Sequence, residues 1–421
     1  MSESVCPLTL PGIGDIVVFI GLIGLMLMEY GLCRPENANH LLLKNWLQFS
    51  IGIVAWWVLG YGFAFGNVAD SEFIGNRNFG GEKWLTERSE NHGACASFFA
   101  LCGFFVLFVI NGGISEKAKY HVYVVLAFWI MLFVWPVIVA WSWGGGWLAI
   151  ELKKDLIDVG GAINIHMFAG AIGLMGAIFS GKRRGRWRPS KAAKFQIQMY
   201  PIYIIGAVLL ILGLFGLNFS IGQSRADQMG MSAANSWICA GATSIVALKL
   251  LTLFSKDLHT HTIAIYQGFI AGMVVISSSA YNTTPWQAGI VGIMTGVIFA
   301  FTYKFVLYLQ IDDPMSVTAT FLVPGLVGGI LPGFITDEDG CFWQGISGHT
   351  LSTQVIGVIV VLGWALVWAV ILFTVLTVVG GMRLRDHIQK YGLAKTHIMQ
   401  SGFVYVKDEV ITKGEEVEDI S

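Results

Sequence analysis

The sequence predicts an all-α polytopic membrane protein with eleven transmembrane helices. Of the 421 residues, 55% are hydrophobic and only 13% are charged, whereas an average globular chain carries about 25% charged residues. Too few charges remain to coat a soluble protein of this length, so much of its surface must face lipid. The 51 glycines agree with this, because small residues let membrane helices approach one another closely.

Eleven apolar stretches each approach or exceed the length of about 20 residues that a helix needs to cross a bilayer. They lie at 11–32, 46–66, 94–115, 120–142, 158–181, 198–222, 232–254, 261–280, 286–310, 316–336 and 352–381. Polar or Gly/Pro-containing breaks separate them. We therefore expect a short extracellular N-terminus (1–10), a membrane domain (11–381) and a cytoplasmic tail (382–421).

The positive-inside rule sets the expected orientation, because cytoplasmic loops carry an excess of Lys and Arg. The loop after the fifth stretch contains Lys182, Arg183, Arg184, Arg186, Arg188, Lys191 and Lys194. The loop 67–93, on the opposite side, has more acidic than basic residues. The N-terminus is therefore expected outside and the C-terminus inside, with the protein in the plasma membrane. The net charge of −1 gives no reason to expect nucleic acid as a partner.

Two ionisable residues mark the fifth stretch, and such residues inside a span are costly and usually functional. Asp158 lies at its outer start, and His166 follows eight residues later. That spacing corresponds to about 12 Å of helical rise, with the side chains within about 80° of one another. A carboxylate near the mouth and a deeper imidazole suit the path of a small cation. A capping Asp and a packed His are the structural alternative.

Trp143 precedes three consecutive glycines, Gly144 to Gly146, at the expected outer surface. Tryptophans at this depth commonly belong to the aromatic belt of a membrane protein. The functional alternative is a cation–π site, because the face of an indole ring attracts small cations.

Other polar features have simpler interpretations. Asp312 and Asp313 precede Pro314, a pattern typical of a helix N-terminus. The six cysteines and the nearby pair His259 and His261 lack the spacing of a metal site. We expect no cofactor or metal. The sequence leaves open a disulfide among the cysteines expected near the outer face, which are Cys6, Cys95 and Cys341.

Taken together, the chain resembles the ammonium transporter family (Amt/Mep/Rh) along nearly its whole length. The matching elements, in the order of the family, are Leu42–Trp46 with Leu59–Gly66, Trp143–Gly146, Asp158–Gly161 with His166, Gly213–Asn218, Asp312–Pro314 with Gly325, Gly328 and Gly333, and Gly381–Leu384. Any one of these elements is weak, whereas six in the correct order make a strong match.

The resemblance implies a homotrimer with one pore in each subunit, and an inverted pseudo-repeat of helices 1–5 and 6–10. It also implies recruitment of NH₄⁺ at an outer vestibule that includes Trp143, Asp158 and Ser220. Passage of NH₃ through an apolar pore would follow, because a desolvated cation is costly there. In the family, two histidines touch in the pore, and His166 matches the first of them.

The second pore histidine is replaced here. Counting from Asp313 without a gap places Phe321 at its position, and a phenyl ring cannot donate, accept or carry a proton. The outer phenylalanine of the third helix falls at or near Cys102, with Phe104 two residues on. The phenylalanine of the sixth helix becomes Leu217, and the vestibule serine falls on Ile221, next to Ser220.

Three functions are consistent with these features. The first is transport of ammonium or ammonia, and the second is an ammonium sensor or regulatory paralogue that conducts weakly or not at all. The third is a pore for another small neutral solute, such as methylamine or CO₂. The sequence contains no nucleophile–base constellation, so we do not expect an enzyme.

Overall fold

The computed structural model describes residues 12–82, 84, 92–150, 156–220, 226–335, 349–385 and 389, which are mostly helical. The first half of the chain contains α1 (Ile13–Leu32), α2 (Pro35–Ala55), η1 (Trp56–Gly60), α3 (Tyr61–Phe65), α4 (His92–Ile114), α5 (Tyr120–Trp129), η5 (Ile130–Val134), α6 (Trp135–Ser142), α7 (Trp147–Ile150), η6 (Ala162–Met167) and α8 (Phe168–Ser180). The second half contains α9 (Tyr200–Ser220), α10 (Ala226–Thr252), α11 (Leu258–Ile276), α12 (Pro285–Tyr308), η9 (Thr318–Leu322), α13 (Val323–Ile330), α14 (Pro332–Ile335) and α15 (His349–Val379). Short 3₁₀ turns connect some of them, at η2 (Val68–Asp70), η3 (Phe79–Gly81), η7 (Pro189–Phe195) and η8 (Ala280–Asn282).

Ten helical segments of the described chain are long and apolar enough to cross a membrane. They correspond to ten of the eleven predicted spans. The remaining span, predicted at 261–280, is the 19-residue helix α11. That helix is long enough to cross, but polar residues such as His261 and Gln267 lower its hydropathy. The expected membrane architecture is therefore confirmed, with one span that hydropathy alone undervalues.

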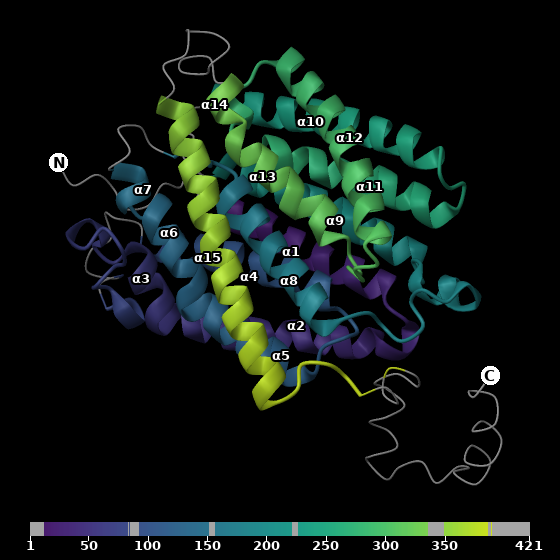
Figure 1. The fold of residues 1–421 in the computed structure, drawn as a ribbon. Helices are drawn as coiled ribbons and strands as arrows, with labels where there is room; N and C mark the ends of the chain where they lie inside the picture. The colour runs from purple at the N-terminus through teal and green to yellow at the C-terminus, as the bar shows by residue number, and fades with distance from the viewer. Residues whose placement is uncertain are drawn as a thin grey trace.

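The outer surface of the bundle is apolar, as expected of a protein that faces lipid or neighbouring subunits. Ile245 on α10, Phe301 on α12 and Val378 on α15 are each at least 70% exposed. Figure 1 shows α15 (yellow) running along one face of the bundle. By contrast, nearly every residue of α4 is buried. A helix that is apolar on all sides belongs at the centre of the packing, and α4 takes that position.

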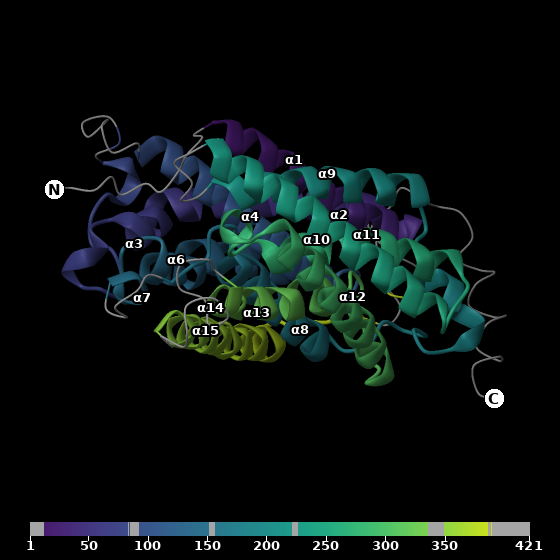
Figure 2. The same cartoon turned by 90° about the horizontal axis from the view of Figure 1, so that it is seen from above.

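Glycines bring α1 and α9 together, and the two helices lie side by side in Figure 2. A Cβ atom on Gly24 would lie 2.3 Å from the backbone nitrogen of Leu210, and one on Gly213 would lie 2.3 Å from Cα of Gly21. Such distances are too short for a side chain. Close contact between backbones is how membrane helices gain packing energy without a hydrophobic driving force.

The second predicted span began too late. Helix α2 starts at Pro35 rather than at residue 46, with the proline in its first turn. The additional turns are polar, but their polar groups have partners: Lys44 Nζ lies 2.7 Å from Glu29 Oε1, and Asn45 Nδ2 donates to Glu29 Oε2. Hydropathy does not detect such pairing, which explains the error.

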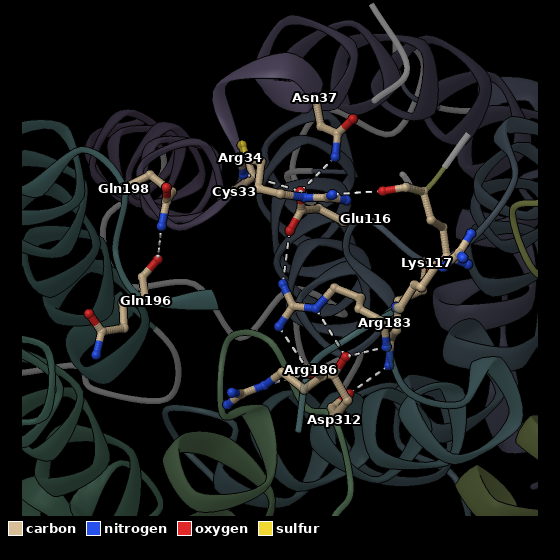
Figure 3. Close-up of polar contacts among 12 residues, drawn as sticks. Cys33, Arg34, Asn37, Glu116, Lys117, Arg183, Arg186, Gln196, Gln198 and Asp312 are labelled. Carbon is tan, nitrogen blue, oxygen red and sulfur yellow. Dashed lines mark hydrogen bonds and ion pairs between the residues drawn. The ribbon is translucent and has the colours of Figure 1, made fainter. Parts of the chain in front are cut away.

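A buried ion cluster ties the ends of several helices together on the expected cytoplasmic side (Figure 3). We call it the Arg183 cluster, and it consists of Arg34, Glu116, Arg183, Arg186 and Asp312. Arg183 Nη1 lies 2.8 Å from Glu116 Oε2, and its Nη2 lies 2.9 Å from Asp312 Oδ1. Arg34 Nε lies 3.0 Å from the other oxygen of Glu116, and Arg186 Nε lies 3.3 Å from Asp312 Oδ1.

Candidate functional site

Two helices form the centre of the candidate site, and each begins with a π-helical turn. The first is η6 followed by α8, and the second is η9 followed by α13. Short π-helical segments are rare and often occur at functional sites. His166 lies in the first of these turns and Phe321 in the second.

Aspartates hold the start of both turns in the same way. Asp158 Oδ1 and Oδ2 accept hydrogen bonds from the backbone nitrogens of Ile163 and Asn164, at 3.1 and 2.9 Å. Asp313 likewise accepts from the backbone nitrogens of Val317 and Thr318, at 3.0 and 2.9 Å. In each helix the residue of interest follows its aspartate by eight positions. The geometry therefore agrees with the gap-free count that placed Phe321 opposite His166.

His166 and Phe321 lie face to face in the interior. Their ring centroids are 5.9 Å apart with an interplanar angle of 24°. Phe105 of α4 lies edge-on to His166, with centroids 5.4 Å apart. Both His166 ring nitrogens are buried and have no hydrogen-bond partner among the described residues. The imidazole thus keeps one donor and one acceptor available to a small polar solute or water.

Glycines allow these two helices to cross near this pair. A Cβ atom on Gly170 would lie 2.5 Å from the backbone nitrogen of Leu322, and one on Gly325 would lie 2.6 Å from that of Met167. Gly170 follows His166 by four residues, as Gly325 follows Phe321. The crossing is therefore matched in the two halves, which supports the expected inverted repeat.

Replacing Gly325 by Ala is expected to lower thermal stability in detergent by the equivalent of about 1–3 kcal/mol, the usual cost of overpacking. The new methyl group would clash with two backbone atoms of η6, Met167 N and Ala162 O. Backbone atoms cannot move away by changing rotamer, as a side chain can. Gly363→Ala in α15 is the matched control, because nothing lies within 4 Å of its Cβ position. Equal melting temperatures for both variants would contradict this account of the crossing.

Trp143 is turned toward the protein interior. Its indole nitrogen donates to the carbonyl oxygen of Asp158, at 3.1 Å, and its ring lies 5.4 Å from that of buried Phe99. The glycines after it are needed for a tight turn: a Cβ atom on Gly144 would lie 2.1 Å from the carbonyl oxygen of Ala64, and Gly145 has a φ of 79°. These contacts anchor the ring to the start of η6 and to α4, and the role of Trp143 at the mouth remains a prediction.

The structure places the other predicted site residues as follows. Cys102 and Leu217 are fully buried in the main hydrophobic core. Phe104 stacks on Phe49 of α2, with centroids 4.2 Å apart, so it points to a different helix than Phe105 does. Ser220 ends α9, but its side chain lies outside the described residues, as do Cys6 and Cys341. Roles for these residues remain predictions.

Sequence reasoning missed the two α4 phenylalanines that contact the candidate site, which are Phe99 beside Trp143 and Phe105 beside His166. Together with Cys102 they are spaced by three residues, so successive members lie about 60° apart and the three span about 120° of the helix surface. That spacing was a usable signal, but α4 is so uniformly apolar that several faces looked equally suitable.

Comparisons with known proteins agree with this arrangement. The sequence profile described as "Ammonium Transporter Family" matches residues 13–403. The putative ammonium transporter sll1017 of Synechocystis sp. is 24% identical over 382 residues, which cover 88% of this chain and 83% of that protein.

Two solved structures are similar in fold. A protein titled "Sensor Amt Protein" superposes with a TM-score of 0.81 at 24% identity, over 90% of this chain and 95% of that one. Mep2 of Saccharomyces cerevisiae gives a TM-score of 0.77 at 22% identity, over 89% and 86% of the two chains. With its multi-pass helical architecture, its two matched helices that begin with π-helical turns and a profile match across most of its length, the chain belongs to the Ammonium Transporter Family.

Proposed function

We propose that this protein transports ammonium or ammonia across a membrane, with NH₃ passing the buried imidazole of His166. The observation that carries the proposal is the His166 site itself: a fully buried ring, flanked by Phe105 and Phe321, with both nitrogens unpartnered among the described residues. Membership of the family supplies the substrate class.

The chemistry follows from the cost of desolvation. Stripping water from NH₄⁺ between phenyl rings is expensive, whereas neutral NH₃ loses far less. A neutral imidazole offers one N–H donor and one acceptor to NH₃ or to water. Asp158 has a supporting role in this proposal, because both of its carboxylate oxygens are used by backbone N–H groups. Its carbonyl oxygen orients Trp143 at the mouth.

A second candidate function is that of an ammonium sensor or regulatory paralogue that conducts weakly or not at all. Phe321 is the observation that favours it, because this phenyl ring stacks on His166 at the position where a proton-carrying partner is expected. A pore for another small neutral solute, such as methylamine or CO₂, is a third candidate. Uptake of labelled ammonium and methylammonium into proteoliposomes separates these functions. Uptake well above that of empty liposomes is expected for a transporter, whereas binding without uptake would favour a sensor.

Replacing Trp143 by Leu is expected to raise the ammonium concentration at half-saturation. The loss of apparent affinity should be about 0.5–2 kcal/mol, because the quadrupole of the ring is lost. Trp143→Phe is the matched comparison, since it keeps an aromatic face but loses the N–H that donates to Asp158. If the Phe variant behaves as the Leu variant does, that hydrogen bond rather than the aromatic face is responsible. Unchanged half-saturation in both variants would leave Trp143 a purely structural residue.

We also propose a homotrimer in the plasma membrane, with the N-terminus outside and the C-terminus in the cytoplasm. The cationic loop after α8 supports this orientation. The exposed apolar side chains of α10 and α12 supply surface for subunit contacts. Native mass spectrometry in mild detergent is expected to show a trimer, and a spectrum with monomer alone would contradict it.

A further inference from the structure

A cavity of about 390 Å³ opens beside the end of α8, away from the His166 site. Except for Gly185, every residue that lines it is cationic or aromatic: Lys182, Arg183, Arg184, Arg186, Trp187, Arg188 and Arg383. The first six come from one short loop, and Arg383 comes from the segment after α15. A Cβ atom on Gly181, where the loop begins, would lie 3.1 Å from Arg383 Nη1. Two distant parts of the chain therefore converge on one cationic cavity.

The loop is held in shape by its own backbone and by buried carboxylates. The backbone nitrogens of Arg186 and Arg188 donate to the carbonyl oxygens of Arg183 and Gly185, at 3.0 and 3.1 Å. Arg183 and Arg186 are fixed by the Arg183 cluster (Figure 3). The guanidinium carbon of Arg186 also lies 4.7 Å from the ring centroid of Trp187. A site built in this way loses little conformational entropy on binding a ligand.

Two of the cations that line the cavity have no carboxylate partner among the described residues. Glu116 forms an ion pair with Arg183, and Asp312 forms ion pairs with both Arg183 and Arg186. Lys182 and Arg188 are exposed, and neither forms an ion pair with a carboxylate of the described chain. The indole nitrogen of Trp187 is buried and has no hydrogen-bond partner among the described residues. Cations and an N–H donor thus line one cavity, and no acidic side chain of the described chain lines it.

We propose that this cavity binds a phosphate group, with the headgroup of an anionic phospholipid as its source. Guanidinium groups match the oxygens of a phosphate with paired hydrogen bonds. The cavity begins two residues after α8 ends at Ser180, a position that corresponds to the depth of lipid headgroups. Basic pockets at the cytoplasmic ends of membrane helices commonly hold such lipids. The choice of leaflet rests on the orientation proposed above, whereas binding of the phosphate group does not.

The test is native mass spectrometry of the full-length protein with short-chain phosphatidic acid, using short-chain phosphatidylcholine as the neutral comparison. Phosphatidic acid is expected to bind at least about tenfold more tightly than phosphatidylcholine, because each Lys or Arg near an anionic headgroup contributes about 1 kcal/mol. The triple variant Lys182→Gln/Arg184→Gln/Arg188→Gln, which leaves the Arg183 cluster intact, is expected to lose most of that preference. Arg188→Gln alone, at the exposed rim, is expected to lose part of it.

The matched control removes three other exposed cations from the same half of the protein, in Lys194→Gln/Lys249→Gln/Lys256→Gln. It is expected to keep the preference for phosphatidic acid. Equal losses in the two triple variants, or equal binding of both lipids to the wild type, would overturn the proposal. If inorganic phosphate displaces the lipid at a comparable concentration, the cavity is a phosphate site. Its ligand is then a soluble phosphate, and the lipid headgroup is overturned as the source. Because the readout is binding, failure of this test is separable from failure of the proposed transport.

Discussion

Replacing Arg183 by Met is expected to reduce stability by about 3–5 kcal/mol, the typical effect of removing one partner from a buried ion pair. Arg183 is only 4% exposed and holds the side chains of both Glu116 and Asp312. Without it, two buried carboxylates lose their main counter-charge. The loss should appear as a lower melting temperature in detergent and as reduced recovery of folded protein.

Arg186→Met is the matched control for this prediction. Arg186 also pairs with Asp312, but through one contact at 3.3 Å, and its side chain is 20% exposed. More exposed ion pairs contribute about 0–1 kcal/mol, so this variant should melt close to the wild type. Similar melting temperatures for the two variants would show that the charge of the loop, rather than the buried geometry of Arg183, sets stability.

The pH dependence of stability should differ between the wild type and Arg183→Met. Burial favours a higher pKa for Glu116 and Asp312, but the neighbouring guanidinium groups, Arg183 foremost, outweigh it and hold both pKa values below the ordinary range. Groups of this kind stabilise the fold above their unfolded pKa values, which are about 4, and that contribution is lost only as the pH falls through the lower folded values. The contribution of this cluster to the stability of the wild type should therefore be constant between about pH 5 and pH 7.

In Arg183→Met the balance reverses, because burial then dominates and the folded pKa values of the two carboxyl groups rise. A folded state that binds protons more tightly than the unfolded state gains stability as the pH falls. The variant should recover part of its lost stability between about pH 7 and pH 5, where the wild type does not change. Melting temperatures measured across this range give the two slopes directly.

Much of the fold could be predicted from the sequence because membrane spans are set by length and apolar composition. The predicted boundaries of α4 and α12, for example, lie within two residues of the observed ones. The position of Phe321 opposite His166 was also predictable, from the resemblance to the family and a gap-free count from Asp313. A cap fixes the start of a helix, and helical geometry then fixes the depth of every residue that follows.

Features that depend on contacts with other parts of the chain could not be predicted from the sequence. The polar start of α2 is helical because Glu29 and Glu116 receive its polar side chains. Likewise, the sequence marks Arg183 only as one member of a cationic cytoplasmic loop, although it lies buried between two carboxylates. The rotation of α4, which presents Phe105 rather than Phe104 to His166, depends on packing with several helices at once. Periodicity in a uniformly apolar helix contains no such information.

Replacing Phe321 by His is expected to create or enlarge an ammonium-induced current in protein reconstituted on a solid-supported membrane. The wild-type phenyl ring stacks on His166 at 5.9 Å, so an imidazole at this position would lie within reach of the nitrogens of His166. Two adjacent imidazoles can exchange a proton, whereas one imidazole beside a phenyl ring cannot. If the wild type conducts, net transfer should therefore be nearer to electroneutral NH₃ movement than to NH₄⁺ movement.

Two comparison variants make the result interpretable. Phe104→His adds a buried imidazole that would face Phe49 instead of His166, and it is expected to add no current. His166→Ala removes the only imidazole of the described site and should lower uptake of labelled ammonium about tenfold, in line with roughly 1–3 kcal/mol of lost hydrogen bonding to the solute. A current in Phe104→His as large as that in Phe321→His would mean that any new polar group admits the ion.

The wild type itself then decides between the functions. Currents that match ammonium uptake charge for charge would rule out the electroneutral interpretation and require a proton path that bypasses Phe321. No uptake in the wild type, together with gain of uptake in Phe321→His, would instead favour the sensor, because the fold would be competent and the phenyl ring alone would block passage. Wild-type uptake without current, lost in His166→Ala, is the outcome that the geometry of the site favours: a single imidazole can hydrogen-bond NH₃ but has no neighbour among the described residues to which it can pass a proton.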